Sequence, residues 1–289
     1  MSISMSTDHL INCLDDLRRW VTDQKSAGRT IGVVPTMGAL HEGHLSLVRA
    51  SLEKADATVV TIFVNPTQFA AGEDLEKYPK TLASDLAQLA SAGPVVVFAP
   101  TVADMYPAQF STLIVPPTIA KTLEGEKRPT HFAGVATVVL KLLNLTSADF
   151  AFFGQKDFQQ QLVVARMVKD LNVPTEIVMC PIARAADGLA LSSRNAYLTV
   201  AERQIALTLH QTLVAIENQI RQGQRDSYEL IVEMRQRLID GGVTSIEYAA
   251  IADPLTLETP EKIRLPVVAL VAAYVGRTRL IDNCVIAEN

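Results

Sequence analysis

Apolar and polar positions alternate along the first 180 or so residues with the periods of strands and helices. Short apolar runs typical of buried strands lie at residues 30–34, 57–64, 95–98, 149–153 and 175–179, with a further candidate at 112–115. Stretches with apolar residues at helical spacing lie between them, at residues 10–28, 43–55, 81–92, 132–145 and 157–171. This alternation predicts a parallel sheet covered by helices on both faces, with ligands bound at the carboxyl ends of its strands.

The pattern changes after about Arg184. Thr199 and Glu202 fit a capping box that begins a helix reaching about residue 221, and a second helix over 226–240 ends at two glycines. Three strand-like runs follow at residues 246–251, 267–274 and 279–286, the last two joined by a predicted hairpin turn at 276–278. We therefore predict a Rossmann-like, doubly wound α/β domain over residues 1–183 and a smaller α+β domain over 184–289.

Composition narrows the class of protein. Hydrophobic residues make up 48% of the chain and charged residues 20%, as in ordinary well-packed soluble proteins. A formal net charge of −5 disfavours binding to nucleic acid or to anionic membranes. Three scattered cysteines form no disulfide framework, and the apolar stretch at 265–275 is too short to span a bilayer. We expect a cytoplasmic protein with neither a membrane nor a nucleic-acid partner.

Two histidines three residues apart mark the most informative segment. His41 and His44 follow the strand at 30–34, where the next helix opens near Gly43. Unpaired N–H groups at a helix start suit a phosphate, and two imidazoles on one face of the first turn can each donate a hydrogen bond to it. A zinc pair is disfavoured because the other histidines and cysteines form no cluster of three or four ligands. Simple helix capping remains an alternative for the two residues taken alone.

Three more polar clusters follow predicted strands. Residues 65–68 end the strand at 57–64, residues 154–157 end the strand at 149–153, and residues 184–195 follow the last strand of the first domain. Each has a structural alternative, since Asp157 can cap a helix and Ser192 and Ser193 can form a turn. Together with the histidines, however, Lys156, Ser192, Ser193 and Arg194 supply the charge, hydroxyls and guanidinium that typically bind a triphosphate. No Walker or dinucleotide-binding glycine pattern is present.

These residues resemble a known family. The segment His41-Glu42-Gly43-His44 resembles the HxGH signature of the nucleotidyltransferase superfamily, and Ser192-Ser193-Arg194-Asn195 is similar to its second signature. Five ordered motifs, at residues 35–44, 62–69, 128–132, 153–157 and 187–195, resemble the pantothenate synthetase (pantoate–β-alanine ligase) family, and residues 280–283 match it as well.

The resemblance implies an ATP-dependent ligase that condenses pantoate with β-alanine. The products would be pantothenate, AMP and pyrophosphate, formed through a bound pantoyl adenylate, with Mg²⁺ accompanying ATP. It also implies a homodimer whose partners are small molecules. Two alternatives remain at this stage: another HxGH nucleotidyltransferase with a different acceptor, and a nucleotide sensor without turnover.

The resemblance also implies residue roles. His44 would be the proton donor, with His41 and Lys156 beside it at the phosphates, and Asp157 would reach the ribose. The implied ATP site comprises Met37, Gly38, His41, Gly43, His44, Gly154, Lys156, Asp157, Ala183, Leu191, Ser192, Ser193 and Arg194. Gln68 and Gln160, with Met37, would hold pantoate, because amides pair with its hydroxyls without repelling its carboxylate.

Some positions depart from the family pattern. Gln155 stands where Glu is frequent, and Ala133 replaces a common Arg. Ser84 precedes Asp85 where many members carry two acidic residues in a row. Asp85 is therefore the candidate metal ligand. The adenylate must be kept from water, and residues 124–131 are a candidate cover for it, with a solvated hairpin as the alternative.

Overall fold

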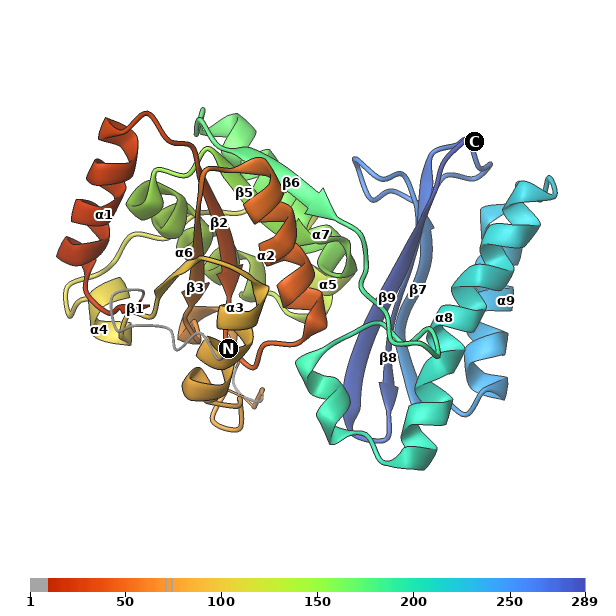
Figure 1. The fold of residues 1–289 in the computed structure, drawn as a ribbon. Coiled ribbons are helices and arrows are strands. Elements are labelled where there is room, and N and C mark those ends of the chain that lie inside the picture. The colour runs from red at the N-terminus through yellow and green to blue at the C-terminus, as the bar shows by residue number, and fades with distance from the viewer. Residues whose placement is uncertain (1–9, 71, 74, 289) are drawn as a thin grey trace. The chain divides into compact units, whose positions relative to one another are not determined.

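The computed structural model describes residues 10–70, 72–73 and 75–288. The chain forms two compact units, one comprising Met1–Gly154 and Gln159–Pro181, the other comprising Gln155–Phe158 and Ile182–Asn289 (Figure 1). The short piece 155–158 thus belongs to the second unit, although the sequence on either side of it belongs to the first. Each unit has its own sheet and its own apolar core.

The first unit is built on a six-stranded parallel sheet with the order β1-β4-β3-β2-β5-β6. Its strands are β1 (Leu10–Ile11), β2 (Ile31–Thr36), β3 (Ala57–Ile62), β4 (Val96–Phe98), β5 (Phe150–Gly154) and β6 (Glu176–Cys180). The chain leaves the central strand β2 toward β3 on one side and returns to β5 on its other side. That reversal creates a topological switch point at the carboxyl ends of β2 and β5, where ligands of such sheets bind. The predicted doubly wound α/β fold is confirmed.

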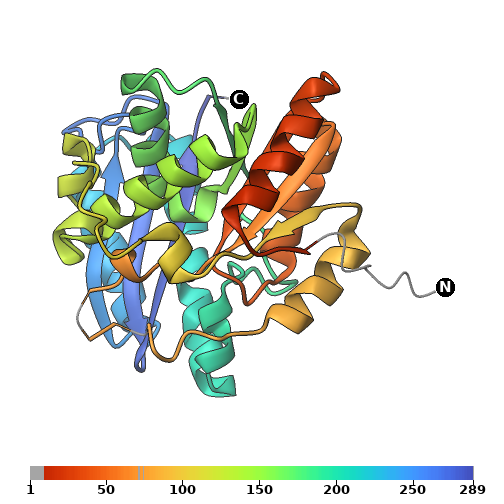
Figure 2. The same ribbon diagram turned by 90° about the vertical axis from the view of Figure 1, so that its left-hand side faces the viewer.

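Helices cover both faces of this sheet. The unit contains α1 (Leu14–Ser26), α2 (Glu42–Lys54), α3 (Leu82–Ala92), α4 (Val102–Met105), α5 (Glu124–Lys127), α6 (His131–Thr146) and α7 (Phe158–Asp170). The first residue of α7, Phe158, is assigned to the second unit and the rest of the helix to the first. Helices α1, α6 and α7 pack on one face, and Figure 2 looks toward α1 and α6. Helices α2 and α3 pack on the other face. Successive strand residues such as Val33 and Val34 enter opposite cores, as the pleat of a strand requires.

Two predictions about local elements were wrong. Leu10 and Ile11 do not open the first helix but form β1, paired with Val97 and Phe98 of β4. Residues 112–115 form no strand, and Val115 is 89% exposed. Both errors have one cause: a short run of β-formers becomes a strand only where a neighbouring strand edge is available, and sequence pattern does not show that edge.

The second unit places two helices on one antiparallel sheet. Strands β7 (Ser245–Ala252), β8 (Val267–Val275) and β9 (Thr278–Ile286) pair in that order. Helices α8 (Val200–Arg221) and α9 (Ser227–Asp240) share a core with this sheet (Figure 1). The Thr199–Glu202 capping box forms as predicted, and Val275 pairs with Thr278 across the predicted hairpin turn.

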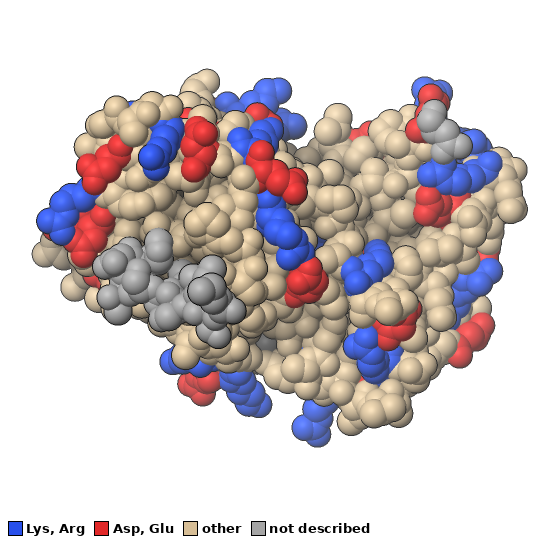
Figure 3. Space-filling model, viewed as in Figure 1, with Lys and Arg blue, Asp and Glu red and all other residues tan. Residues whose placement is uncertain are grey.

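Charged side chains do not gather into a field of one sign on the face shown in Figure 3, where blue and red groups are interspersed. Among the described residues, none of the helices is both long and apolar enough to cross a membrane.

Candidate active site

The two histidines begin α2 by capping it reciprocally. His41 is the N-cap, and its Nδ1 accepts a hydrogen bond from the N–H of Gly43 at 3.1 Å. His44 Nδ1 accepts from the N–H of His41 at 3.3 Å, and the two ring centroids lie 4.1 Å apart. Because both Nδ1 atoms accept, each neutral ring carries its proton on Nε2. The capping role and the predicted donor role are therefore compatible, since they use different nitrogens.

Asp85 holds the loop that leads to His41. This carboxylate on α3 is only 1% exposed, and it accepts hydrogen bonds from the N–H groups of Leu40 (2.9 Å) and Ala39 (3.1 Å). The hydroxyl of Thr81 donates to both of its oxygens. Ala39 has φ 50°, a strained conformation for a residue with a side chain, so the loop needs such an anchor. The structure thus gives Asp85 a part in shaping the histidine loop, and its oxygens are already occupied by donors.

We expect Asp85→Asn to weaken this loop without changing the response to Mg²⁺. The amide keeps one acceptor and turns an NH₂ group toward a main-chain N–H, which should lower the free energy of unfolding by about 1.5–3 kcal/mol. Fluorescence of Trp20, the single tryptophan of the chain, which packs against the core of the first unit, reports this unfolding. An increase in the Mg²⁺ concentration needed for half-maximal activity, with unchanged stability, would instead make Asp85 a metal ligand.

Gln68 and Met37, two of the three residues predicted to hold pantoate, lie together in the first unit. Gln68 ends the short 3-10 helix η2 (Pro66–Gln68), and its Nε2 donates to Met37 Sδ at 3.1 Å. Asn65, which is 1% exposed, donates from Nδ2 to Gln68 Oε1 at 3.1 Å and so fixes which end of the Gln68 amide is the donor. Gln160 lies half-buried on α7.

The Asn65 side chain anchors η2 through further hydrogen bonds. Asn65 Oδ1 accepts from Thr67 N, from Thr67 Oγ1 and from the hydroxyl of Tyr106. Asn65 Nδ2 also donates to the carbonyl of Gly134 on α6. Sequence reasoning missed the role of Asn65, although an Asn directly after a strand and before a proline is a recognisable cap signal.

Residues 124–131 do not form a solvated hairpin. Residues 124–127 form the helical turn α5, in which Glu124 and Gly125 are buried, and His131 is only 7% exposed. Arg128 packs between Glu73 and Glu124. The hairpin interpretation assumed an exposed loop, because five of the eight residues carry formal charge or can acquire it. Glu124 pairs with Arg128 instead, which allows its carboxylate to be buried, whereas Glu126 and Lys127 stay exposed.

Burial makes the charge state of His131 sensitive to folding. Burial, followed by the nearby Arg128 charge, lowers the pKa of His131 from its ordinary 6.5 to about 4, so the folded protein keeps the ring neutral at pH 7. Between pH 6.5 and about 4 the unfolded chain binds a proton that the folded chain does not. Stability conferred by the neutral ring is therefore present above pH 6.5 and lost as the pH falls toward 4.

Acidification should therefore destabilise the first unit by up to about 3 kcal/mol through His131 alone. His131→Asn removes this titration, so the stability difference between wild type and variant should shrink as the pH falls from 7 to 4. Chemical denaturation followed through Trp20 measures both proteins. His210, whose pKa is also lowered by burial, titrates equally in the two and cancels. A difference that stays constant with pH would contradict the expectation.

Lys156 lies in the second unit, on the 3-10 turn η4 (Gln155–Asp157). Asn283 of β9, only 2% exposed, donates from Nδ2 to the carbonyls of Gln155 and Lys156, both at 2.9 Å. These bonds tie residues 155 and 156 to β9 of the second unit. The Lys156 Nζ lies 3.8 Å from Asp157 Oδ2, and its side chain is 19% exposed. Sequence reasoning quoted residues 280–283 as a family match but gave Asn283 no role.

The Ser192–Arg194 turn lies near the same lysine. Ser192 caps the 3-10 helix η5 (Ser193–Tyr197), and its hydroxyl accepts from the N–H of Arg194. Lys156, Ser192 and Asn195 line one small hollow, together with Asp282. Asp282 is neutralised by a bidentate ion pair with Arg184, at 2.7 and 2.9 Å. Lys156 is the positively charged residue among those that line this hollow.

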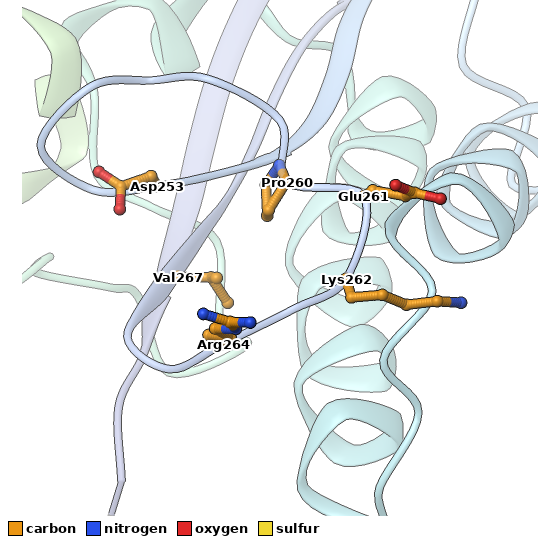
Figure 4. Close-up of a pocket in the computed structure, with 6 residues that line it drawn as sticks. All are labelled: Asp253, Pro260, Glu261, Lys262, Arg264 and Val267. Atoms are coloured by element: carbon orange, nitrogen blue, oxygen red, sulfur yellow. The ribbon is translucent and has the colours of Figure 1, made fainter.

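The predicted residues divide between the two units. Those in the first are Met37, Gly38, His41, Gly43, His44, Gln68, Asp85, Gly154 and Gln160; those in the second are Lys156, Asp157, Ala183, Leu191, Ser192, Ser193 and Arg194. The N–H of Leu191 donates to the Ala183 carbonyl, which closes the loop between them. A separate hollow of about 490 Å³, lined by six residues between 253 and 267, contains none of these residues (Figure 4).

Comparison with known proteins identifies the family. Residues 9–285 match the family model described as Pantoate-beta-alanine ligase. The chain belongs to this family. The family resemblance deduced from the five motifs is thereby confirmed.

Individual family members are similar over nearly the whole chain. A pantothenate synthetase of Bradyrhizobium diazoefficiens is 49% identical over 279 residues, which cover 96% of this chain and 98% of the relative. A crystal structure of pantothenate synthetase from Thermus thermophilus superposes with a TM-score of 0.92 at 39% identity, covering 97% of this chain and 100% of that one. The Francisella tularensis ligase, complexed with beta-gamma ATP and beta-alanine, has a TM-score of 0.79 at 35% identity, covering 96% and 97%.

Proposed function

We propose that this chain joins pantoate to β-alanine at the expense of ATP, yielding pantothenate, AMP and pyrophosphate. The observation that carries the proposal is the family match over residues 9–285, which spans both units. The Francisella relative supports it, since its described ligands are an ATP compound and β-alanine. The polar groups at the histidine loop and the Lys156 hollow suit such chemistry.

The first step of the proposed reaction forms an acyl adenylate. A carboxylate oxygen of pantoate attacks the α-phosphorus of ATP, and the bond between that phosphorus and the bridging oxygen breaks, so that its electron pair leaves with pyrophosphate. Alignment and charge neutralisation dominate such transfers, and no protein nucleophile is required. The Nε2–H groups of His41 and His44 donate to phosphate oxygens, with His44 as the proton donor.

The other ATP roles follow the family pattern. Lys156 and Arg194 neutralise the triphosphate. The hydroxyls of Ser192 and Ser193 donate hydrogen bonds to it, and Leu191 lies beside them. Asp157 binds the ribose and the main chain at Ala183 meets the adenine. Met37, Gly38, Gly43 and Gly154 line the nucleotide at the carboxyl ends of β2 and β5, where the switch point of the sheet favours ligand binding.

Pantoate is held by Gln68 and Gln160, with Met37 beside Gln68. The orientation that Asn65 gives Gln68 leaves its Oε1 as acceptor and its Nε2 as donor, which suits a substrate with both hydroxyl and carboxylate groups. In the second step, the amine of β-alanine attacks the acyl carbon and displaces AMP. One proton is released from the amine as the amide forms.

Mg²⁺ enters this scheme as part of the substrate MgATP. Among the described residues no group of three or more His, Cys, Asp or Glu is placed to hold a metal ion, and the Asp85 oxygens are occupied by three donor groups. The residues that the structure describes therefore do not fit a resident metal site. Nucleotide phosphates are the usual ligands of Mg²⁺ in such enzymes.

Pantoate-dependent exchange of labelled pyrophosphate into ATP tests both substrate and reaction. The proposal expects exchange with ATP and pantoate, and AMP formation once β-alanine is added. Equal exchange with unrelated carboxylic acids would favour a transferase with a different acceptor. Tight ATP binding without exchange or AMP would favour a nucleotide sensor. The proposal includes a homodimer acting in the cytoplasm, and sedimentation of the purified protein tests the dimer.

A further inference from the structure

The main-chain carbonyl of Gln68 is held by two side chains that come from sixty or more residues away in the sequence. Arg128 Nη2 donates to this oxygen at 3.2 Å, and His131 Nδ1 lies 2.9 Å from it. Both partners are largely buried, with His131 7% and the Arg128 side chain 15% exposed. Water therefore competes little for these bonds.

The Arg128–His131 contact decides the tautomer of the ring. Arg128 Nη1 lies 3.2 Å from His131 Nε2, and a guanidinium can only donate. Nε2 is therefore the acceptor, and the single proton of the neutral ring is on Nδ1, which donates to Gln68. Arg128 thus acts on Gln68 twice, once directly and once by setting the proton position of His131.

Two carboxylates hold Arg128 in place. Its Nε and Nη2 donate to the two oxygens of Glu73, both at 2.7 Å, and its Nη1 donates to Glu124 at 3.2 Å. With the contacts to His131 and Gln68, all five N–H groups of the guanidinium are engaged. A group held this completely is well suited to fixing another one in space.

The Gln68 side chain is fixed separately, through Asn65 and Met37. The carbonyl and the side chain of Gln68 share one Cα, so a shift of the main chain at residue 68 moves the side-chain amide with it. The contacts to the carbonyl therefore hold the position from which the amide projects, and Asn65 and Met37 hold its direction.

We propose that Arg128 and His131 are positioning residues for the acid substrate, which hold the Gln68 carbonyl so that its amide faces pantoate. The inference rests on the proposed binding of pantoate by Gln68. It assigns these residues no contact with ATP. Replacing either residue should raise the Michaelis constant for pantoate and leave the Michaelis constant for ATP unchanged.

The experiment compares His131→Leu with His131→Asn. Leucine fills similar space but donates nothing, so the KM for pantoate in pyrophosphate exchange should rise by about 10–100-fold, with the KM for ATP within about twofold of wild type. Asparagine places an N–H donor near the former Nδ1 and should restore most of the affinity. Leu143→Ala, in the same helix but with no hydrogen bond to Gln68, controls for general destabilisation: it should unfold earlier and keep the wild-type KM values.

An unchanged KM for pantoate in folded His131→Leu overturns the inference, and so does an equal rise in both KM values. Should His131→Leu fail to fold by Trp20 fluorescence, Arg128→Lys takes its place, since lysine keeps the charge between the two acids but cannot bridge to Gln68. Wild-type exchange that needs no pantoate overturns the proposed function together with this inference. Pantoate-dependent wild-type exchange with unaffected variants overturns this inference alone.

Discussion

His44→Asn should slow pantoate-dependent pyrophosphate exchange by about 10²–10³-fold, because it removes one donor aimed at developing phosphate charge. The asparagine Oδ1 lies as many bonds from Cα as the histidine Nδ1 does. It can therefore keep accepting from the N–H of His41, and α2 keeps its cap. We expect the unfolding transition reported by Trp20 to stay within about 0.5 kcal/mol of wild type.

His44→Gln is the matched control for this substitution. Its Nε2 matches the bond count of the histidine Nε2, whereas no acceptor remains at the Nδ1 position. The glutamine should retain more exchange activity than the asparagine and should lose about 1 kcal/mol of stability through the cap. Equal exchange rates in wild type and His44→Asn would remove the donor role. A stability loss in His44→Asn that accounts for the lost activity would reduce His44 to a helix cap.

Gly134→Ala should damage both stability and pantoate binding, although alanine is the better helix former by about 1 kcal/mol. A Cβ at residue 134 would lie 2.2 Å from the Thr67 carbonyl oxygen and 2.7 Å from Gln68 N. Main-chain atoms cannot rotate away as a side chain can, so η2 must move. We expect a loss of about 2–3 kcal/mol in unfolding free energy. Displacement of Gln68 should reduce kcat/KM for pantoate by about 10²-fold.

Gly154→Ala serves as the stability control for Gly134→Ala. A Cβ there meets no atom within 4 Å, so Trp20 fluorescence should show an unchanged or slightly raised unfolding free energy. Gly154 lines the proposed nucleotide site, and its variant is therefore compared for stability only. Wild-type stability and wild-type kcat/KM in Gly134→Ala would show that η2 tolerates the shift, and that the close packing of α6 on η2 does not position Gln68.

Much of the fold follows from local pattern. The strands at 31–36 and 57–62 and the helices that follow them were predictable because buried parallel strands are continuous apolar runs and amphipathic helices repeat every 3.6 residues. The capping box at Thr199 and the hairpin between β8 and β9 were equally predictable, since both depend on residues close in sequence. The two failures, at residues 10–11 and 112–115, concern segments whose state depends on a distant strand edge.

Site residues divide in the same way. The histidine pair, Gln68, Lys156 and the Ser192–Arg194 turn were predictable because each carries its chemistry in a short motif. The contacts that hold them come from elsewhere: Asp85 reaches the loop before His41, and Asn283 reaches the main chain beside Lys156. The sequence did not predict these supporting roles of Asp85 and Asn283, because a hydrogen bond between distant segments produces no recognisable spacing of residues.

The sequence alone determined the main succession of helices and strands, the family and the residue types available for phosphate and acid binding, since these depend on local periodicity and on short motifs. Only the tertiary structure decided which nitrogen of His41, His44 and His131 carries the proton, that Asp85 shapes a loop, and that Glu124 and His131 are buried beside Arg128. The physical reason is that tautomers, buried charges and strained turns depend on partners supplied by other parts of the fold. A residue acquires such partners when the chain packs, and its neighbours in sequence do not specify them.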